Sequence, residues 1–274
     1  MGNKLVIVRG GGDIASGSIE KLHNCGFNIL ILEIEKPSAI RRAVCYGEAV
    51  YENEMIIENI KSKKINSLEE IEKLFEERVI PVFIDPTGES IKKLKPTIVI
   101  DGILAKRNLG TNKEMAPITV ALGPGFIAGK DVDIVVETER GHNLGRLIFE
   151  GTAAENTGIP GNIAGYTKER VIHSHYDGII KNVKEIGDIV STGEVIARIS
   201  DREVHATIDG VLRGIIRDGF KVTENFKIAD IDPRINEQKN CFTISDKARS
   251  IGGGVLESVF LLMRKKEIEF YLGK

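Results

Sequence analysis

The sequence predicts an α/β protein whose first segment is a nucleotide-type βαβ unit within a Rossmann-like, mostly parallel sheet. The first observation is the order of strand-like run, glycine-rich turn, helical spacing and second strand-like run within residues 5–32. The second is that further apolar runs, separated by loops and a helical segment, continue to residue 136. The third is a change after about residue 165 to a duplicated β module, which is followed by a final helix.

The first βαβ unit is read from its apolar periodicity. Residues 5–8 are β-branched or aliphatic and uncharged, which is typical of a buried strand, and the turn at residues 9–13 follows at once. Ile14, Ser18 and Leu22 then share one helical face, and Gly26 stands where a helix would end. Residues 27–32 predict the second strand, which ends at Glu33.

The remainder of the predicted sheet comes from the apolar runs 79–84, 98–100, 118–122 and 134–136. Between them, residues 67–78 show helical spacing, and Ser67 with Glu70 would form a capping box. This alternation predicts a doubly wound sheet. We expect one domain from residues 1–165, completed by 236–274, with a second module at 166–235.

The second module contains an internal repeat. Residues 177–199 align without gaps on residues 209–231, with identity at seven positions. Each copy predicts short strands around a turn, and two copies facing each other would make a small two-fold β sandwich. The element at residues 187–193 resembles lipoyl and biotinyl carrier domains, but the connection at 200–208 has no lysine. The resemblance therefore implies a lipoyl-like, barrel-sandwich fold without the swinging arm.

The last segment predicts a glycine turn at residues 252–254 that leads into a C-terminal helix. Leu256, Val259, Phe260 and Met263 would form one apolar stripe that returns to the N-terminal sheet. Gly253, in the turn, is a candidate for anion binding by backbone amides.

Composition argues against several classes of protein. The formal net charge is -2, whereas broad nucleic-acid contact usually brings a basic excess. No apolar run approaches the length of a membrane span, and Arg9 interrupts the first hydrophobic stretch, so we expect neither a membrane partner nor a secretory signal. The three cysteines are widely spaced, which predicts no disulfide framework or metal site and favours a reducing cytoplasm.

The N-terminal turn carries the sharpest candidate site. Its pattern Gly10-x-Gly12-x-x-Ala15 matches the dinucleotide fingerprint, in which backbone amides meet a pyrophosphate. The candidate cofactor-binding residues here are Gly10, Gly11, Gly12, Asp13, Ala15 and Glu33, the last placed like a ribose-binding acid. Because Asp13 would repel a phosphate, the alternative is a packing turn in which Asp13 caps the helix.

Loops after later strands supply candidates for phosphate binding, namely the cations Lys106, Arg107, Arg140 and Arg146 and the neutral amide Asn108. For Lys106, Arg107 and Asn108 the alternative is a solvated loop without a ligand. His142 lies between the last two arginines and is the candidate for proton transfer near neutral pH. Cys45 is a candidate reactive thiolate only if it is exposed beside positive charge.

Eight segments that occur in order between residues 9 and 257 resemble a known family: RGGGDIASG, LEIEKPSAIRRAVCYGEAVYE, LAKRNLGT, ALGPGFIAG, VVETERGHNLGR, NTGIPG, ADIDPR and ISDKARSIGGGVLE. Together they are similar to the YqeB-type proteins of the selenium-dependent molybdenum hydroxylase system. The SIGGGVLE segment also resembles the XdhC-type accessory proteins of xanthine dehydrogenase. The resemblance implies a cytoplasmic accessory role in maturing a molybdenum hydroxylase, with that enzyme and its other maturation proteins as partners.

The ligand implied by this resemblance is a phosphate-bearing small molecule such as molybdopterin cytosine dinucleotide. Two other functions stay open. An NAD(P)-dependent oxidoreductase would suit the fingerprint and Glu33, although no Tyr-x-x-x-Lys set for hydride transfer follows. A non-catalytic assembly scaffold would use the β module for docking. The sequence decides neither whether the chain is an enzyme nor whether it forms a homo-oligomer.

Overall fold

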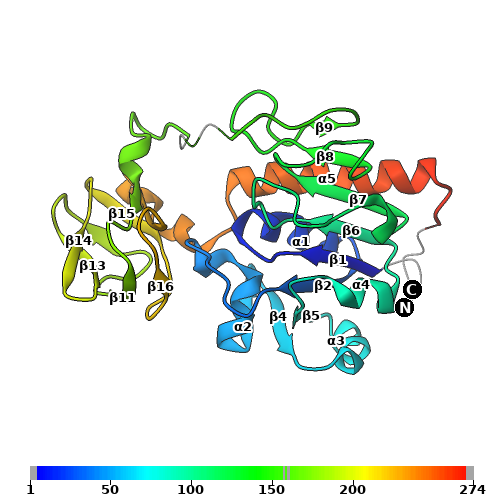
Figure 1. Ribbon diagram of the computed structural model, residues 1–274, viewed down its shortest axis with the longest axis horizontal. Coiled ribbons are helices and arrows are strands. Elements are labelled where there is room, and N and C mark those ends of the chain that lie inside the picture. Colours follow the sequence, from blue (N-terminus) through cyan, green and yellow to red (C-terminus); the bar gives the residue numbers. More distant parts are fainter. Residues whose placement is uncertain (1–4, 157, 159–160, 270–274) are drawn as a thin grey trace. The chain divides into compact units, whose positions relative to one another are not determined.

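The computed structural model describes residues 5–156, 158 and 161–269, which fall into two compact units (Figure 1). Unit 1 consists of Met1–Pro37, Cys45–Asn156 and Ile244–Lys274, and unit 2 of Ser38–Val44 and Thr157–Thr243. The chain therefore enters unit 2 twice, first for a short segment and later for most of its length. Each unit has hydrophobic clusters of its own.

A nine-stranded mixed sheet forms the centre of unit 1. Neighbouring strands from the second to the eighth position are parallel, whereas both edge strands run antiparallel to their neighbours. In spatial order the strands are β3 (Glu54–Ile57), β4 (Ile60–Ile65), β5 (Ile80–Ile84), β2 (Asn28–Glu33), β1 (Leu5–Arg9), β6 (Ile98–Asp101), β7 (Ile118–Leu122), β8 (Ile134–Val136) and β9 (Leu147–Ile148).

Helices cover both faces of this sheet, which explains why its central strands are apolar throughout. On one face, α1 (Asp13–Asn24) and α5 (Asp246–Lys265) pack with Val6 and Val8 of β1, and α2 (Ala49–Glu52) joins the same cluster. On the other face, α3 (Ile71–Glu76) and α4 (Glu89–Leu94) pack with Ile7. Because successive strand residues point to opposite faces, β1 contributes to both clusters.

Helices α1 and α5 approach each other through glycines. A Cβ atom added to Gly17 would meet the carbonyl oxygen of Ala248, and one added to Gly252 would meet the carbonyl oxygen of Gly17. The helix α5 begins at Asp246, after Ser245 caps it by accepting a hydrogen bond from the Ala248 amide at 3.2 Å. The predicted turn at 252–254, with Gly253, is therefore wrong: these residues lie inside α5, where close packing outweighs the low helix propensity of glycine.

Unit 2 contains two four-stranded antiparallel sheets. One has the order β10 (Val171–His173), β17 (Lys227–Asp232), β15 (Gly210–Ile215) and β12 (Ile189–Val190). The other has the order β14 (Arg202–His205), β13 (Val195–Ile199), β11 (Gly178–Asn182) and β16 (Lys221–Val222). Their inward side chains form one cluster, which also receives Ile40 and Ala43 from the first visit of the chain.

The sequence offset of 32 residues relates the two sheets of unit 2 as a local two-fold. The Gly187 amide donates to the Leu212 carbonyl at 2.9 Å, and the equivalent Gly219 amide donates to the Ile180 carbonyl at 2.8 Å. Strand pairs are exchanged likewise, since β11 pairs with β16 and β12 pairs with β15. Each sheet thus draws strands from both copies of the repeat, so neither copy forms a sheet by itself.

The predicted fold class is corrected by these topologies. The large sheet is mixed because β3 and β9 are antiparallel edges, and the connections β6–β7 and β7–β8 contain no α-helix, so a Rossmann-like doubly wound sheet with a lipoyl-like insertion is not the right description. We describe the fold as α/β, with one large mixed sheet and two smaller antiparallel sheets. Apolar periodicity predicted strands but carried no information on the direction of edge strands. Among the described residues, no helix combines the length and apolarity needed to cross a membrane.

Candidate functional site

Glycine-rich loops from distant parts of the sequence meet where the parallel strands of unit 1 end. A Cβ added to Gly10 would lie 3.0 Å from the Ile103 Cα, and one added to Gly125 would lie 2.7 Å from the Arg107 Cα. One added to Gly145 would lie 2.8 Å from the Ser250 carbonyl oxygen. We call residues 10–13, 102–107, 123–125, 137–146 and 245–254 the glycine edge. Its loops pack backbone against backbone, which explains the need for glycine.

The N-terminal turn divides into a packed part and an open part. Gly10 has a positive φ of 86°, and the Gly11 carbonyl accepts a hydrogen bond from the Gly47 amide at 3.0 Å. Ala15 is fully buried and would touch any Cβ added to Gly102. Gly12, by contrast, has nothing within 4 Å of an added Cβ. Only the Gly12 side of the turn therefore has space for a ligand.

Two of the predicted acidic residues have roles that the sequence did not show. Gly12 is the N-cap of α1 and Asp13 is its first helical residue, so Asp13 lies one position beyond the cap. Glu33 accepts hydrogen bonds from the Gly11 amide at 2.7 Å and the Ile34 amide at 3.0 Å. Burial raises the pKa of Glu33, and these two backbone hydrogen bonds oppose the rise. In this structure Glu33 holds the glycine turn in place.

The N-terminal ends of α1 and α5 lie together at the glycine edge. Gly17 of α1 packs on Ala248 near the start of α5, and Phe27 after α1 contacts Phe260 near its end, so the two helices run in the same direction. Each helix N-terminus carries a partial positive charge from its unpaired amides. An anion at this end of the pair would be stabilised by both helices.

Lys247 lies at this junction and was missed as a candidate in the sequence. Burial lowers its pKa and Arg140 lowers it further, while Asp13, Glu137 and Asp246 oppose the shift. The only sequence signal was its place in the ISDKARS segment, two residues after the cap Ser245. Arg140, which was predicted, donates to both carboxylate oxygens of Asp246, at 2.6 and 3.1 Å. Lys247 and Arg140 are thus the cations that the structure brings to the paired helix ends.

The other residues predicted to bind phosphate have more local surroundings. Lys106 and Arg107 are exposed in the loop that packs against Gly125. Asn108 accepts hydrogen bonds from the Gly110 and Thr111 amides, each at 2.8 Å, and so shapes its own loop. Arg146 donates to the Asn143 side chain at 3.1 Å. These hydrogen bonds hold Asn108 and Arg146 within their own loops.

The two candidate reactive residues differ in accessibility. His142 is exposed in the loop between Glu137 and Arg146. Cys45 is only 1% exposed, so the condition of exposure set for a reactive thiolate is not met. Burial also raises the pKa of the Cys241 thiol, which is 2% exposed. Among the residues that the structure describes, no group of three or more His, Cys, Asp or Glu side chains is placed to hold a metal ion.

A chain of buried hydrogen bonds lies beneath the glycine edge, and the sequence did not predict it. Arg9, the last residue of β1, donates to the Thr111 hydroxyl, which in turn donates to Asp101 at the end of β6. Burial raises the pKa of Asp101, while hydrogen bonds from Thr111 and Ile103 and the charge of Arg9 oppose this. Asp101 and Arg9 are both nearly inaccessible, so they fix the ends of two central strands.

Comparison with known proteins identifies one close relative by sequence. No protein-family model matches the chain. "Uncharacterized protein YqeB" of Escherichia coli (strain K12) is 49% identical over 264 residues, which are 96% of this chain and 49% of that protein. The chain thus spans about half the length of the curated relative it matches.

Solved structures give only remote likenesses. The product-bound ectoine utilization protein EutE (DoeB) from Ruegeria pomeroyi is 10% identical, covers 84% of this chain and 85% of its own, and has a TM-score of 0.26. An aspartoacylase family protein from Mesorhizobium loti is 14% identical with the same two coverages and a TM-score of 0.24. Scores this low establish neither fold nor activity. What the comparisons establish is that, over nearly all its length, the chain is similar to part of YqeB.

Proposed function

We propose that the chain is an accessory factor in the maturation of a molybdenum hydroxylase and binds a phosphate-bearing cofactor at the glycine edge. The observation that carries this proposal is the meeting of sequence motifs in space. The segments at residues 9–17, 104–111, 121–129, 135–146 and 244–257, which carry the family resemblance, all contribute to that edge. Backbone packing accounts for Gly10, Gly125 and Gly145, but it does not account for the open space beside Gly12 at an edge where two helix N-termini meet.

The residues at the edge suit a pyrophosphate such as that of molybdopterin cytosine dinucleotide. Gly12 offers an extended backbone with open space beside it, and the first turns of α1 and α5 would stabilise negative charge. Lys247 would neutralise a phosphate oxygen, and Arg140 would do so after exchanging its contact with Asp246 for the ligand. When bound, the cofactor would supply the pterin that holds molybdenum, while the chain would bind and orient its phosphates.

A thermal-shift titration tests the binding step. The probes are inorganic pyrophosphate, CTP, NAD, NADP and molybdopterin cytosine dinucleotide extracted from a hydroxylase. A ligand at about 100 times its dissociation constant stabilises the fold by roughly 2.7 kcal/mol, which is readily measured. We expect the pterin dinucleotide to raise the melting temperature, and Lys247→Ala to reduce this rise strongly. Lys239→Ala, which removes an exposed lysine in unit 2, is the matched control.

The outcomes separate the open functions. A shift with NAD or NADP in place of the pterin dinucleotide would favour an oxidoreductase. No shift with any phosphate-bearing probe would contradict cofactor binding and favour a scaffold. Maturation itself is tested in cells that lack the gene, where the wild-type chain should restore hydroxylase activity and Lys247→Ala should not. Restoration by Lys247→Ala at wild-type level would argue against the glycine edge.

A further inference from the structure

Each of the two sheets of unit 2 has an outer face, and the local two-fold relates these faces. A residue on one face corresponds to the residue 32 positions away on the other. Paired residues on adjacent antiparallel strands point to the same side of a sheet. On the β14-β13-β11-β16 sheet, two neighbouring rows point outward, one of Glu203, Arg198 and Lys181 and one of Ile179 and Lys221. We call this outer surface the open face. Subtracting or adding 32 gives the matching positions on the other sheet, which are Val171, Asp230, Arg213, Val211 and Ile189. We call that surface the covered face.

The central apolar positions of the two faces differ sharply in exposure, although Ile189, at the edge of the covered face, is itself 51% exposed. Ile179 is 61% exposed, whereas its equivalent Val211 is 0% exposed. Val183, just after β11, is 49% exposed, whereas Ile215 is 0% exposed because a bulge between Leu212 and Gly214 pairs Ile215 with Ala229 in the core cluster. For Val211, which lies before this bulge, the low exposure arises from what lies over the covered face.

Two segments of the chain itself lie over the covered face. A Cβ added to Gly214 would touch the backbone of Ile40, and Arg42 donates to the Ile215 carbonyl at 3.2 Å. The 3-10 segment η7 (Ile235–Phe242) packs against β15, and its Gln238 donates to the Gly187 carbonyl at 2.6 Å. Both coverings are non-strand segments that combine apolar side chains with polar groups.

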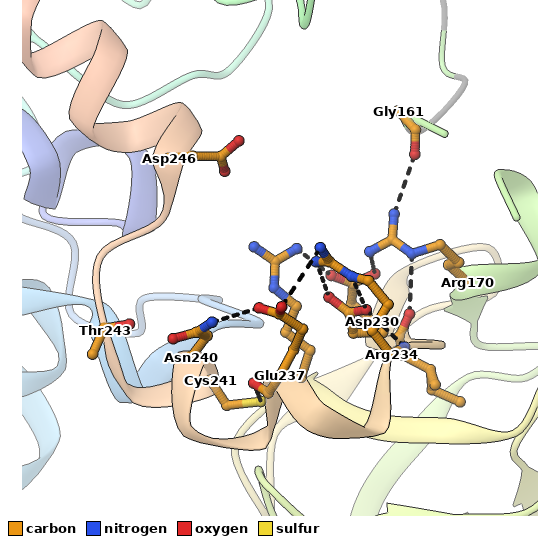
Figure 2. A network of polar contacts seen from close by, with 12 residues as sticks. Gly161, Arg170, Asp230, Arg234, Glu237, Asn240, Cys241, Thr243 and Asp246 are labelled. Carbon is orange, nitrogen blue, oxygen red and sulfur yellow. Dashed lines mark hydrogen bonds and ion pairs between the residues drawn. The ribbon is translucent and has the colours of Figure 1, made fainter. Parts of the chain in front are cut away.

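The charges beneath η7 are balanced within the unit, because three arginines there pair with the three acids Asp230, Asp232 and Glu237 (Figure 2). Asp230 pairs with Arg170 at 3.1 Å and with Arg213 at 3.5 Å. Asp232 pairs with Arg234 at 2.8 Å. The basic residue at the centre of the covered face, Arg213, therefore has a carboxylate as its neighbour on the next strand.

The open face lacks this balance at the same position. Lys181 is the equivalent of Arg213, but the residue directly opposite it is Arg198, which stands where the covered face has Asp230. Arg198 pairs with Glu203 at 3.1 Å on its other side. Like charges directly opposite each other in a sheet are destabilising. An acid from outside would give Lys181 the neighbour that Arg213 has.

We propose that the open face is a docking surface for an acidic segment of a partner protein that also carries apolar side chains. Its apolar residues would cover Ile179 and Val183, and its carboxylates would meet Lys181 and Lys221. A second copy of this chain docking through the same face would bring together two surfaces that each carry Arg198, Lys181 and Lys221 against the single acid Glu203, and this repulsion disfavours that occupant. The surface shares no residue with the glycine edge, so its test does not depend on cofactor binding.

The test is a fluorescence anisotropy titration of the full chain with a labelled peptide of alternating leucine and glutamate. We expect saturable binding that weakens as salt rises from about 0.1 M to about 1 M, where the screening length falls from about 10 to about 3 Å. The double variant Ile179→Asp/Lys181→Glu should bind at least about tenfold more weakly. Lys239→Glu, which makes the same lysine-to-glutamate exchange on η7, should bind like the wild type. Both substituted residues of the double variant are exposed, so folding should be retained and is checked by circular dichroism.

Three results would overturn the proposal. One is the absence of saturable binding by the acidic peptide. Another is equal binding of a peptide in which lysine replaces glutamate, since this would remove charge complementarity as the cause. The third is a wild-type dimer in sedimentation that the double variant abolishes, because a second copy would then occupy the open face.

Discussion

At the residue scale, the buried carboxylates at the strand ends act by holding backbone amides. Glu137 accepts from the Thr138, Glu139 and Ala154 amides at 2.7 to 2.8 Å. Acidic residues directly after strands were visible in the sequence, but their partners were not, because hydrogen bonds to backbone leave no residue pattern. For the same reason Glu33 was interpreted as a ribose ligand, whereas the structure shows its bonds to backbone amides.

Asp85 gives the clearest prediction at this scale. It accepts from the Gly88 and Ser90 amides, at 2.8 and 2.7 Å, and from the Ser90 hydroxyl at 2.6 Å. Burial would raise its pKa, but these hydrogen bonds outweigh burial and lower it. The ionised carboxylate thus stabilises the fold at pH values above about 3.9, which is the pKa of Asp in the unfolded chain. This stabilisation is lost as the pH falls through the lower pKa that Asp85 has in the folded protein. Asp85→Ala should cost about 1–3 kcal/mol in urea unfolding at pH 7, and less below about pH 4. A cost independent of pH would contradict this, and exposed Asp201→Ala is the control.

At the element scale, the glycines of α5 have different roles although they are adjacent in sequence. Gly252 packs on Gly17, whereas a Cβ added to Gly253 would meet nothing within 4 Å. Sequence reasoning treated the triplet as a turn because glycine disfavours helices, and it could not know that α1 would lie against it. The helix itself was predicted from its apolar stripe, but its start was placed too late in the chain.

Single alanine substitutions should separate these roles. Gly252→Ala would force α1 and α5 apart and should lower the free energy of unfolding by about 1–3 kcal/mol. Gly253→Ala, in the same helix, should raise it by about 0.5–1 kcal/mol because alanine favours the helix. Chemical denaturation measures both. Equal effects at the two positions would show that α1 and α5 do not approach through Gly252.

At the scale of the whole molecule, the repeat was readable from sequence, but the exchange of strands was not. Sequence identity at an offset of 32 residues shows that the two copies are alike. It does not show whether the strands of each copy pair with one another or with strands of the other copy. The first visit to unit 2, Ser38–Val44, was equally hidden, because so short a segment has no periodicity. Both features depend on contacts between residues far apart in the chain.

The separate cores predict how the molecule unfolds. Ile31 and Leu212 are fully buried in different hydrophobic clusters, so we expect two calorimetric transitions. Ile31→Ala and Leu212→Ala should each lower the midpoint temperature of one transition only. Each should reduce the free energy of unfolding of that unit by about 2–5 kcal/mol. Ile40→Ala is the decisive variant, because Ile40 is close to Ile31 in sequence but packs in the cluster of Leu212. It should lower the transition that Leu212→Ala lowers, to a smaller extent because Ile40 is only partly buried. If Ile40→Ala instead lowered the midpoint temperature of the transition that Ile31→Ala affects, the segment 38–44 would contribute to the stability of unit 1.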